Sequence, residues 1–593
     1  MKELSDEKRL LVAFLAMIAI LFVWGKFYKP PPPPVKPPVA PAVSTGANSQ
    51  SAQATAASPS GSVPSVTTKN GKAAQPGVTG QNAAPVTQAP VETPLVVESP
   101  LYHIELSNRG AVARSWRLNN YLDDEKPPKP LELVNLSAAQ QFGAWPLSLH
   151  FSDPQLEARA NSALYQVTPA PASTTLIAPI TLEFHWSDGH LDILKSISLA
   201  DDYTAHIKVV ATLDGQLLPV SIGWRGGFGD KGVAQQSQTV AVFYAQNGKI
   251  SLLPIKKLGA ENHQDVPILQ SGPSEFAGIE DQFFAAAFLP PSAATAPTTP
   301  GFDVYHWVQQ HEIGNDERPA EEPEAQIAVG QATAAPLDMR VFVGPKDLRV
   351  LGHLRPQLDG LVQLGWFGII AKPLMQVLQY THRFIPNWGW AIVILTLIIN
   401  MALFPLKLSS FRSMKRMQKV QPEVSSIQNR YKKYSMSDPR KRKMNEEVMA
   451  IYQREGINPL GSCLPMFIQL PFIYAFYRMI AGTIELRHAP WFGWIHDLSV
   501  RDPYYVLPIV MMLSTFLMQK MTPTPAADPT QQRMAMLMPL ALGFIFFRLS
   551  AGLNLYYFTS NLVGIGQQVF LTRTDPVKNG SKPTKPPKPN NSS

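Results

Sequence analysis

Apolar and polar residues follow three different patterns along this chain of 593 residues. The first apolar run extends from Leu10 to Trp24, close to the length of a membrane span, and no small-x-small cleavage site follows it. We therefore expect an uncleaved transmembrane anchor over residues 1–28. Residues 29–95 are rich in Pro, Ala and Ser and cannot bury enough apolar surface to offset the entropy of ordering them. This stretch is predicted to be a disordered linker.

Residues 96–345 change to short segments in which apolar and polar positions alternate, such as "ITLEFHWS" and "YTAHIKVVATL". Turn-forming Asn-Arg-Gly, Ser-Asp-Gly and Asp-Gly sequences separate them. A period of two residues is typical of strands that bury one face. The pattern predicts one large all-β sandwich domain.

Residues 357–385 combine apolar residues with lysine, glutamine, histidine and arginine, so they are too polar to cross a bilayer. We expect an amphipathic helix lying in the membrane interface, with Trp366, Trp388 and Trp390 at headgroup level.

Five further apolar runs follow, which with the anchor gives six predicted membrane spans. The fold class is therefore a polytopic α-helical membrane protein with a large all-β domain outside the cytoplasm. The five runs are Trp388 to Leu408, Leu464 to Ile484, Tyr504 to Met518, Met534 to Phe547, and Leu553 to Leu571.

The loop over residues 411–455 carries about a dozen basic residues against about four acids, which places it in the cytoplasm. The basic tail, 574–593, agrees by parity, so both termini are predicted to be cytoplasmic and the β domain periplasmic. Apolar residues recur at helical spacing on either side of "SMSDP", which predicts a helical hairpin. Its basic face can dock on ribosomal RNA, anionic lipid or a targeting factor, or can simply be solvated. The candidate contact residues are Lys415, Arg416, Lys419, Arg440, Lys441, Arg442 and Lys443.

The net charge of +8 is concentrated in that loop, in the tail and beside the spans, so it gives no reason to expect DNA as a partner. One cysteine, Cys463, excludes a disulfide framework. The sequence contains no H-E-x-x-H, G-x-S-x-G or Gly-rich phosphate loop. We expect no enzymatic activity, no cofactor and no metal.

Polar residues inside the predicted spans are costly in hydrocarbon unless they face protein or water. Thr396 and Asn400 are one helical turn apart and share a face. These side chains either converge on a hydrated cavity or form interhelical hydrogen bonds worth about 0.6 kcal/mol each. Arg478 and Arg548 are expected to reach outward or to face water. The remaining candidate cavity residues are Gln469, Tyr556, Tyr557, Ser560, Asn561 and Gln567.

Several long motifs carry a resemblance to a known family. They include "NPLGSCLPMFIQLPF", "ELRHAPWFGWIHDLSVRDPYYVLPI" and "SAGLNLYYFTSNLVGIGQQ", in order between about Gly365 and Arg573. This stretch closely resembles the YidC family of membrane insertases of Gram-negative bacteria. The resemblance implies a five-helix insertase core over residues 388–573, with a hydrophilic groove open to the cytoplasm and to lipid. It also implies that Thr396 and Tyr557 contact the substrate.

The implied partners are nascent membrane proteins, the Sec translocon, membrane lipids, and the ribosome and signal recognition machinery, the last two through the hairpin and tail. The implied location is the bacterial inner membrane. One position departs from the family, because the groove usually holds an arginine where this chain has Asn400. An asparagine keeps hydrogen-bonding capacity but not the charge. We therefore expect hydration and hydrogen bonding, rather than attraction of acidic segments, to act in this groove.

Two other classes fit parts of the sequence. A transporter or channel also places polar residues in its spans, but the two halves of the chain show no inverted repeat. A membrane-anchored carbohydrate-binding protein or enzyme would place its function in the β domain, and no pair of carboxylates can be assigned there from the sequence.

Overall fold

The computed structural model describes residues 85–170, 173–230, 240–258, 266–291, 301–313, 320–331, 333–365, 367–434, 438–457, 464–521 and 543–574. The predicted anchor, nearly all of the linker and tail, Trp366 and most of the run from Met534 to Phe547 lie outside these residues. The chain divides into two compact units, of which residues 419–457 belong to one, and the β-strands and the other helices to the second.

The strands β1 to β20 lie between Pro94 and Pro345, and this part of the chain is called the β domain here. It is mostly β-sheet, as the alternating pattern predicts. Their bounds are β1 Pro94–Glu98, β2 Tyr102–Ser107, β3 Val112–Leu122, β4 Pro130–Glu132, β5 Leu149–His150, β6 Gln166–Thr168, β7 Thr175–Ile177, β8 Ile180–Ser187, β9 Leu191–Leu199, β10 Thr204–Leu213, β11 Gln216–Leu217, β12 Ser221–Trp224, β13 Ala241–Gln246, β14 Lys249–Pro254, β15 Ile268–Leu269, β16 Phe276–Glu280, β17 Phe284–Leu289, β18 Asp303–Ile313, β19 Ala320–Gly330 and β20 Leu337–Pro345.

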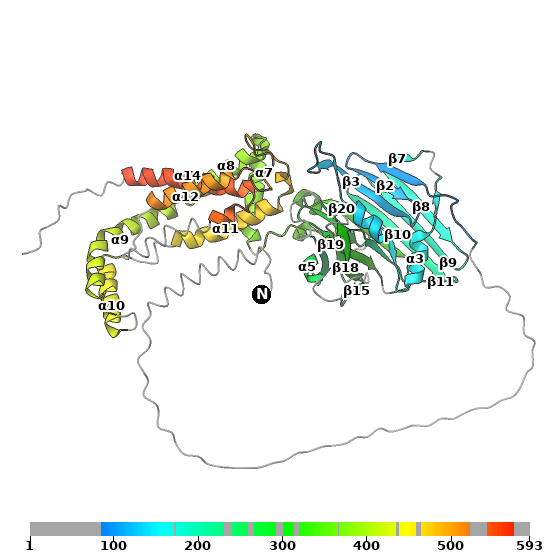
Figure 1. Cartoon of the computed structure of the whole chain (residues 1–593), viewed down its shortest axis with the longest axis horizontal. Helices are drawn as coiled ribbons and strands as arrows, with labels where there is room; N and C mark the ends of the chain where they lie inside the picture. The colour runs from blue at the N-terminus through cyan, green and yellow to red at the C-terminus, as the bar shows by residue number, and fades with distance from the viewer. Residues whose placement is uncertain are drawn as a thin grey trace, which may run out of the picture. The chain divides into compact units, whose positions relative to one another are not determined.

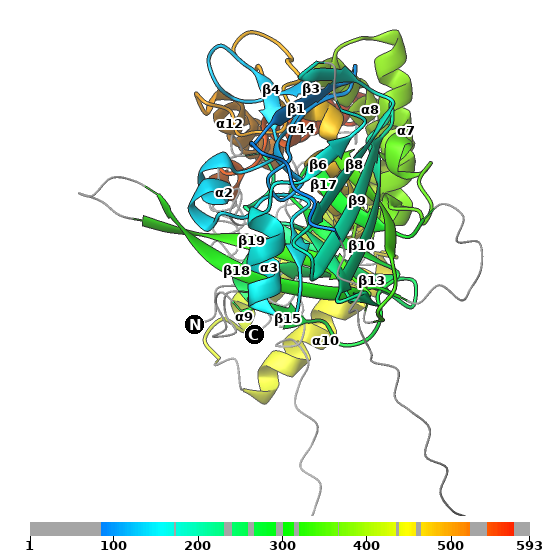
Figure 2. The same ribbon diagram turned by 90° about the vertical axis from the view of Figure 1, so that its right-hand side faces the viewer.

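These strands form three sheets. The largest has the order β14-β13-β16-β17-β20-β10-β9-β8-β6, and the other two have the orders β4-β3-β2-β1-β7 and β15-β18-β19-β12-β5. Figure 1 shows β8, β9 and β10 side by side, and Figure 2 shows β18 and β19 as one long antiparallel pair. Apolar side chains of all three sheets meet in one buried cluster, which explains the period of two in the sequence.

One lysine interrupts that buried pattern. Lys195 on β9 is fully buried, and its Nζ donates to the carbonyl oxygens of Ala111 at 2.6 Å and Leu147 at 2.5 Å. Burial lowers the pKa of Lys195 to about 7, because the charged ammonium is costly away from water.

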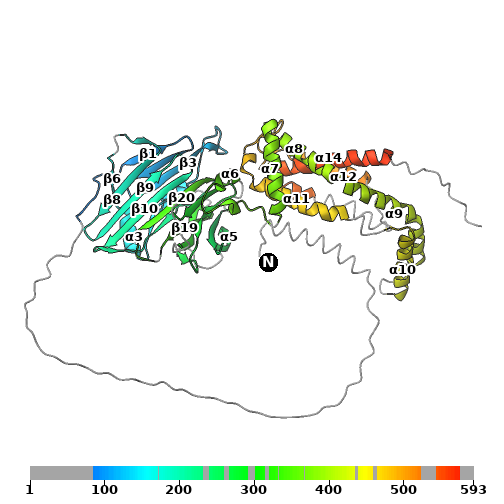
Figure 3. The same ribbon diagram turned by 180° about the vertical axis from the view of Figure 1, so that it is seen from behind.

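The helices gather mainly after the β domain, and Figure 3 shows α8, α12 and α14 side by side. The helix bounds are α2 Leu136–Phe142, α3 Pro154–Ser162, α5 Ile255–Leu258, α6 Leu348–Leu351, η1 Asp359–Leu361, α7 Gly368–Phe384, α8 Trp388–Ala402, α9 Phe404–Arg430, α10 Pro439–Arg454, α11 Leu464–Gly482, η3 Ile484–Leu486, α12 Val506–Met521 and α14 Ala551–Thr574.

Helix α7 falls within the segment predicted to be amphipathic. It packs against α8 and α11 and buries Ala371, Met375 and Leu378. Its outward surface carries both the charged Lys372 and large apolar side chains such as Phe384, which is 69% exposed. Such a mixed surface suits a membrane interface.

The run from Trp388 to Leu408 is not one straight helix. Helix α8 ends at Ala402, and α9 begins at Phe404 with its axis bent by 55°. Judged by length and apolar content, this bent pair can cross a membrane, whereas none of the described helices meets the same criterion singly.

Residues 419–457 contain the end of α9 and the whole of α10. Polar contacts join the two helices, since the Tyr431 hydroxyl donates to Glu447 Oε1 at 2.8 Å and Arg454 pairs with Glu423 at 2.8 Å. Helix α10 begins at Pro439, and Asp438 is its N-cap, with its side chain accepting from the backbone N–H of Arg440.

Candidate functional site

Helix α14 packs against both α8 and α12, and its glycines allow close approach. A Cβ at Gly552 would lie 3.4 Å from the side chain of Ile392 on α8, and one at Gly564 would lie 2.9 Å from the sulfur of Met518 on α12. Because the helices approach closely, polar side chains on facing surfaces can bond directly across the interface.

The first polar cluster lies between α8 and α14. Thr396 and Asn400 are both buried; Thr396 Oγ1 donates to the Ile392 carbonyl at 2.7 Å, and Asn400 Nδ2 donates to the Thr396 carbonyl at 2.8 Å. Asn400 Nδ2 also reaches Ser560 Oγ at 3.3 Å. The structure therefore brings together three of the residues proposed from the sequence.

Two further residues complete this cluster: Lys407, which sequence reasoning did not select, and Gln567, which it did. Lys407, in the first turn of α9, donates from Nζ to Asn400 Oδ1 at 2.6 Å and lies 3.5 Å from Gln567 Oε1. Gln567 Nε2 donates to the Asn400 carbonyl at 3.3 Å. Lys407 follows Asn400 by seven residues, or about two helical turns, and this spacing was the available signal. We call Thr396, Asn400, Lys407, Ser560 and Gln567 the Asn400 cluster.

Asn561 belongs to a separate group on the other side of α14. Its Nδ2 donates to Ser514 Oγ at 2.9 Å and to Thr515 Oγ1 at 2.7 Å, both on α12. Asn561 therefore links α14 to α12 and makes none of the contacts that hold the Asn400 cluster.

The two tyrosines contact aromatic rings. Tyr556 stacks on Phe476 of α11 with ring centroids 3.9 Å apart, and Tyr557 meets Phe546 edge to face at 4.7 Å. Tyr556 is buried and Tyr557 is partly buried. The side chain of Gln469 lies outside the described residues.

The two arginines were expected to reach outward or to face water, and the structure contradicts the second alternative for Arg478. This residue is only 9% exposed, and its Nε donates to the Gln363 carbonyl at 2.8 Å, with Nη2 on the same oxygen. A backbone carbonyl from the segment before α7 thus replaces water as its partner. Arg548 is exposed.

The basic residues proposed for the hairpin are mostly at the surface. Lys415 lies over the Phe411 ring at 4.8 Å, and Arg440 lies over the Tyr434 ring at 4.1 Å. Arg442 pairs with Glu446 at 3.3 Å. Lys415 and Lys441 are partly exposed, and the exposed positions are Arg416, Lys419, Arg440, Arg442 and Lys443.

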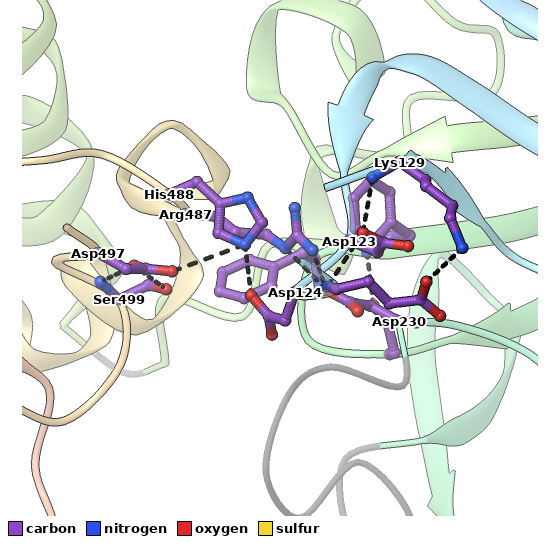
Figure 4. Close-up of polar contacts among 12 residues, drawn as sticks. Asp123, Asp124, Lys129, Asp230, Arg487, His488, Asp497 and Ser499 are labelled. Atoms are coloured by element: carbon purple, nitrogen blue, oxygen red, sulfur yellow. Dashed lines mark hydrogen bonds and ion pairs between the residues drawn. The ribbon is translucent and has the colours of Figure 1, made fainter. Parts of the chain in front are cut away.

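The loop between α11 and α12 contacts the β domain through a buried ion pair (Figure 4). Arg487 Nε donates to Asp230 Oδ2 at 2.8 Å, and their side chains are 4% and 1% exposed. Beside this pair, His488 Nε2 lies 2.7 Å from Asp124 Oδ1. The Arg487 guanidinium is 5.8 Å from the ring of Phe284.

A second buried network lies next to that pair. Lys346 pairs with Glu280 at 3.2 Å, and Gln363 Nε2 donates to Glu280 Oε1 at 2.9 Å. Asp281 accepts from the backbone N–H of Asp230 at 2.8 Å. Burial raises the pKa of Glu280 and of Asp281. Together with an apolar cluster that contains residues of both parts, these contacts join the β domain to the helices.

Fold and site together define a class of protein, in which apolar helices enclose hydrogen-bonded polar side chains and a large β domain docks on one end of the helices. Among the described residues, no group of three His, Cys, Asp or Glu side chains is arranged to hold a metal ion.

Comparison with known proteins then gives the family. Residues 94–377 match the family described as YidC periplasmic domain, and residues 380–578 match the 60Kd inner membrane protein family. The membrane protein insertase YidC of Syntrophus aciditrophicus is 30% identical over 580 residues, covering 96% of this chain and 99% of its own. The chain belongs to the family of YidC membrane protein insertases, as the motifs indicated.

Two other matches cover different fractions of this chain. The membrane protein insertase YidC of Cupriavidus pinatubonensis is 41% identical over 300 residues, so this chain spans about half the length of that relative, 51% of each. A crystal structure described as an active YidC insertase with its first transmembrane domain resolved is 17% identical, with a TM-score of 0.33. That match covers 83% of this chain and 95% of the other.

Proposed function

We propose that this chain inserts and folds integral membrane proteins in the inner membrane, alone or with the Sec translocon. The observation that carries the proposal is a buried, hydrogen-bonded polar cluster between apolar helices, in a chain that aligns over nearly its whole length with a membrane protein insertase. In lipid, such a cluster is costly unless it serves a function or holds helices together.

The proposed topology has six spans, both termini in the cytoplasm and the β domain in the periplasm. Contacts of the α11–α12 loop with the β domain support it, because they put that loop and the β domain at the same end of the helices. The basic residues of the hairpin support a cytoplasmic position for residues 411–455. In this arrangement residues 96–345 are periplasmic and 388–573 form the insertase core.

In the proposed mechanism, a polar segment of the substrate enters along the Asn400 cluster while its apolar segment moves along the lipid-facing side of the helices. Hydrogen bonds from Thr396, Asn400 and Ser560 replace part of the segment's hydration. These hydrogen bonds shorten the stretch of hydrocarbon that the polar segment must cross without polar partners, which lowers the free-energy barrier to insertion. Tyr557 and Gln469 are proposed to contact the same polar segment of the substrate. Tyr556 and Asn561 are proposed to hold together the helices that line its path.

The partners follow from surface chemistry. The exposed basic residues of the hairpin and the tail at 574–593 are proposed to meet the ribosome and the signal recognition machinery. Helix α7, with exposed apolar and basic side chains, is proposed to lie in the lipid headgroup region.

The test is depletion of the protein in its host, followed by protease protection of newly made small membrane proteins. Insertion should fail on depletion and be restored by the full chain. A form that joins residues 1–28 to residues 357–593 should restore it as well, because the proposed path lies in the helices. Normal insertion after depletion would contradict the proposal and favour a transporter. If the full chain restored insertion and the shortened form did not, the β domain would be required for the function.

A further inference from the structure

The β domain contains a pocket that takes no part in the proposed insertion path. It lies between β3, α2 and the end of α3, and its volume is about 370 Å³. Small-molecule sites in proteins have volumes of about 300–1,000 Å³. The lining combines two guanidinium groups, an amide, a hydroxyl and an indole, which belong to Arg109, Arg114, Gln140, Ser148 and Trp145.

The two arginines of this pocket share one carboxylate. Arg109 Nε donates to Glu92 Oε2 at 2.7 Å, and Arg114 Nη2 lies 3.3 Å from Glu92 Oε1. No second carboxylate of the described residues lies within ion-pair distance of either guanidinium. One negative charge therefore faces two positive charges, and the pocket keeps a positive excess. A concave site with such an excess attracts anions.

Arg114 is oriented by stacking on an aromatic ring. Its guanidinium carbon lies 4.4 Å from the centroid of the Trp145 ring, and the indole itself is buried. In the described part of the chain, the hydrogen bonds of Arg114 use only Nη2. Its other N–H groups are therefore available to a ligand, and a stacked guanidinium presents them in a fixed plane.

Neutral polar groups lie in the same pocket. Ser148 is buried, and its Oγ has no hydrogen-bond partner among the described residues. A buried hydroxyl without a partner costs free energy, so a ligand that supplies a partner is favoured. Gln140 is exposed, and its amide can both donate to and accept from a ligand hydroxyl. The pocket thus offers a cation and neutral hydrogen-bonding groups together.

We propose that this pocket binds an acidic sugar, whose anionic group meets Arg114 and whose hydroxyl groups meet Ser148 and Gln140. A carboxylate or a phosphate serves as the anion, because each matches the fork of N–H groups on a guanidinium. Glu92, in the segment just before β1, occupies part of the positive site and competes with the ligand. This binding function goes beyond membrane-protein insertion, since none of these residues belongs to the Asn400 cluster.

The experiment titrates the full-length protein in detergent with glucuronate, glucose 6-phosphate, glucose and inorganic phosphate, and isothermal titration calorimetry measures each affinity. Both acidic sugars should bind at one site, and the tighter one identifies the preferred anion. Glucose should bind about tenfold more weakly or worse, because it forms no charge-assisted hydrogen bond. Inorganic phosphate should bind more weakly than glucose 6-phosphate, because it carries no sugar ring. Failure of both acidic sugars to bind, or equal affinity for glucose or for inorganic phosphate, would overturn the proposal.

Variants of the full-length protein then assign the site. Arg114→Gln should weaken binding of the acidic sugars about tenfold or more. Ser148→Ala should weaken it at an unchanged unfolding midpoint, because the hydroxyl it removes has no partner in the described protein. Glu92→Gln should tighten binding, since it removes the competing carboxylate, and misfolding cannot produce such a gain. The matched control is Arg117→Gln, on the same strand, because Arg117 pairs with Glu105 and does not line the pocket.

The variants also define what would contradict the assignment. Unchanged affinity in Arg114→Gln or in Ser148→Ala would overturn it, as would an equal loss in Arg117→Gln or weaker binding in Glu92→Gln. The proposed insertase function is tested separately by depletion, so either result can fail without the other.

Discussion

Replacing Arg487 by methionine tests whether the β domain is held to the helices by a buried charge pair. Arg487 and Asp230 are 4% and 1% exposed, so solvent screens their attraction very little. Removing the guanidinium leaves the Asp230 carboxylate buried near Asp281, whose Oδ2 already accepts from the backbone N–H of Asp230.

The expected magnitude follows from the loss of one partner from a buried ion pair. Breaking one side of a buried pair costs about 3–5 kcal/mol. For a domain of this size, that corresponds to a fall of roughly 10 °C in the unfolding midpoint. The double variant Arg487→Met with Asp230→Asn removes both charges, and it should recover much of the loss because no ion remains buried.

The assay is thermal unfolding of the intact protein in detergent, combined with hydrogen exchange of β16, β17 and the α11–α12 loop. Lys129→Met is the matched control, because Lys129 forms an ion pair with Glu125 in the same region at 2.6 Å but with both side chains over 60% exposed (Figure 4). That control should leave the midpoint unchanged. Equal midpoints for Arg487→Met and Lys129→Met would refute the reasoning, as would a double variant less stable than Arg487→Met.

Three further predictions concern other parts of the chain. The depressed pKa of Lys195, about 7, means that the unfolded chain binds one proton more than the folded chain above that pH, so stability should rise with pH by up to about 1.4 kcal/mol per unit between pH 7 and 9. Lys195→Met should lack that rise in denaturation curves taken at several pH values, and a parallel curve would contradict the assignment. Asn561→Ala should cost about 1 kcal/mol in detergent unfolding, since it removes two bonds to α12, yet it should leave insertion intact; loss of insertion at normal stability would make Asn561 a substrate contact. Gly389→Ala should lower the unfolding midpoint by the equivalent of about 1–3 kcal/mol, because a Cβ there would lie 2.1 Å from the Trp491 ring; an unchanged midpoint would show that the ring can move away.

The β domain shows what a local pattern can predict. Alternation in "ITLEFHWS" predicts a strand with one buried face, and β8 spans those residues from Ile180 to Ser187, with Leu182, Phe184 and Trp186 buried. The same reasoning has no means to find Lys195, a lysine on the buried face whose acceptors are carbonyls of residues 111 and 147. These carbonyls come from other segments of the chain.

The candidate site shows the same limit within the helices. Helical spacing placed Thr396 and Asn400 on one face, and the structure has them bonded through a backbone carbonyl. Spacing also treated the run to Leu408 as one straight helix, whereas the structure bends it by 55° between α8 and α9, and apolar content does not encode that bend. The expectation for Arg478 did not include a partner within the protein, and the structure supplies one in the Gln363 carbonyl, from the segment before α7.

The sequence by itself determined the strand-rich and helix-rich parts, the motifs that place the chain in its family, and the presence of polar side chains among apolar helices. Each of these depends on residues near one another along the chain, where a period of two or 3.6 residues records which face is buried. Only the tertiary structure decided which partner each polar group meets: Lys407 with Asn400, Asn561 with α12, and Arg487 with Asp230. Those contacts join segments up to 257 residues apart, and they depend on how the helices are rotated and bent against their neighbours, which no local pattern specifies.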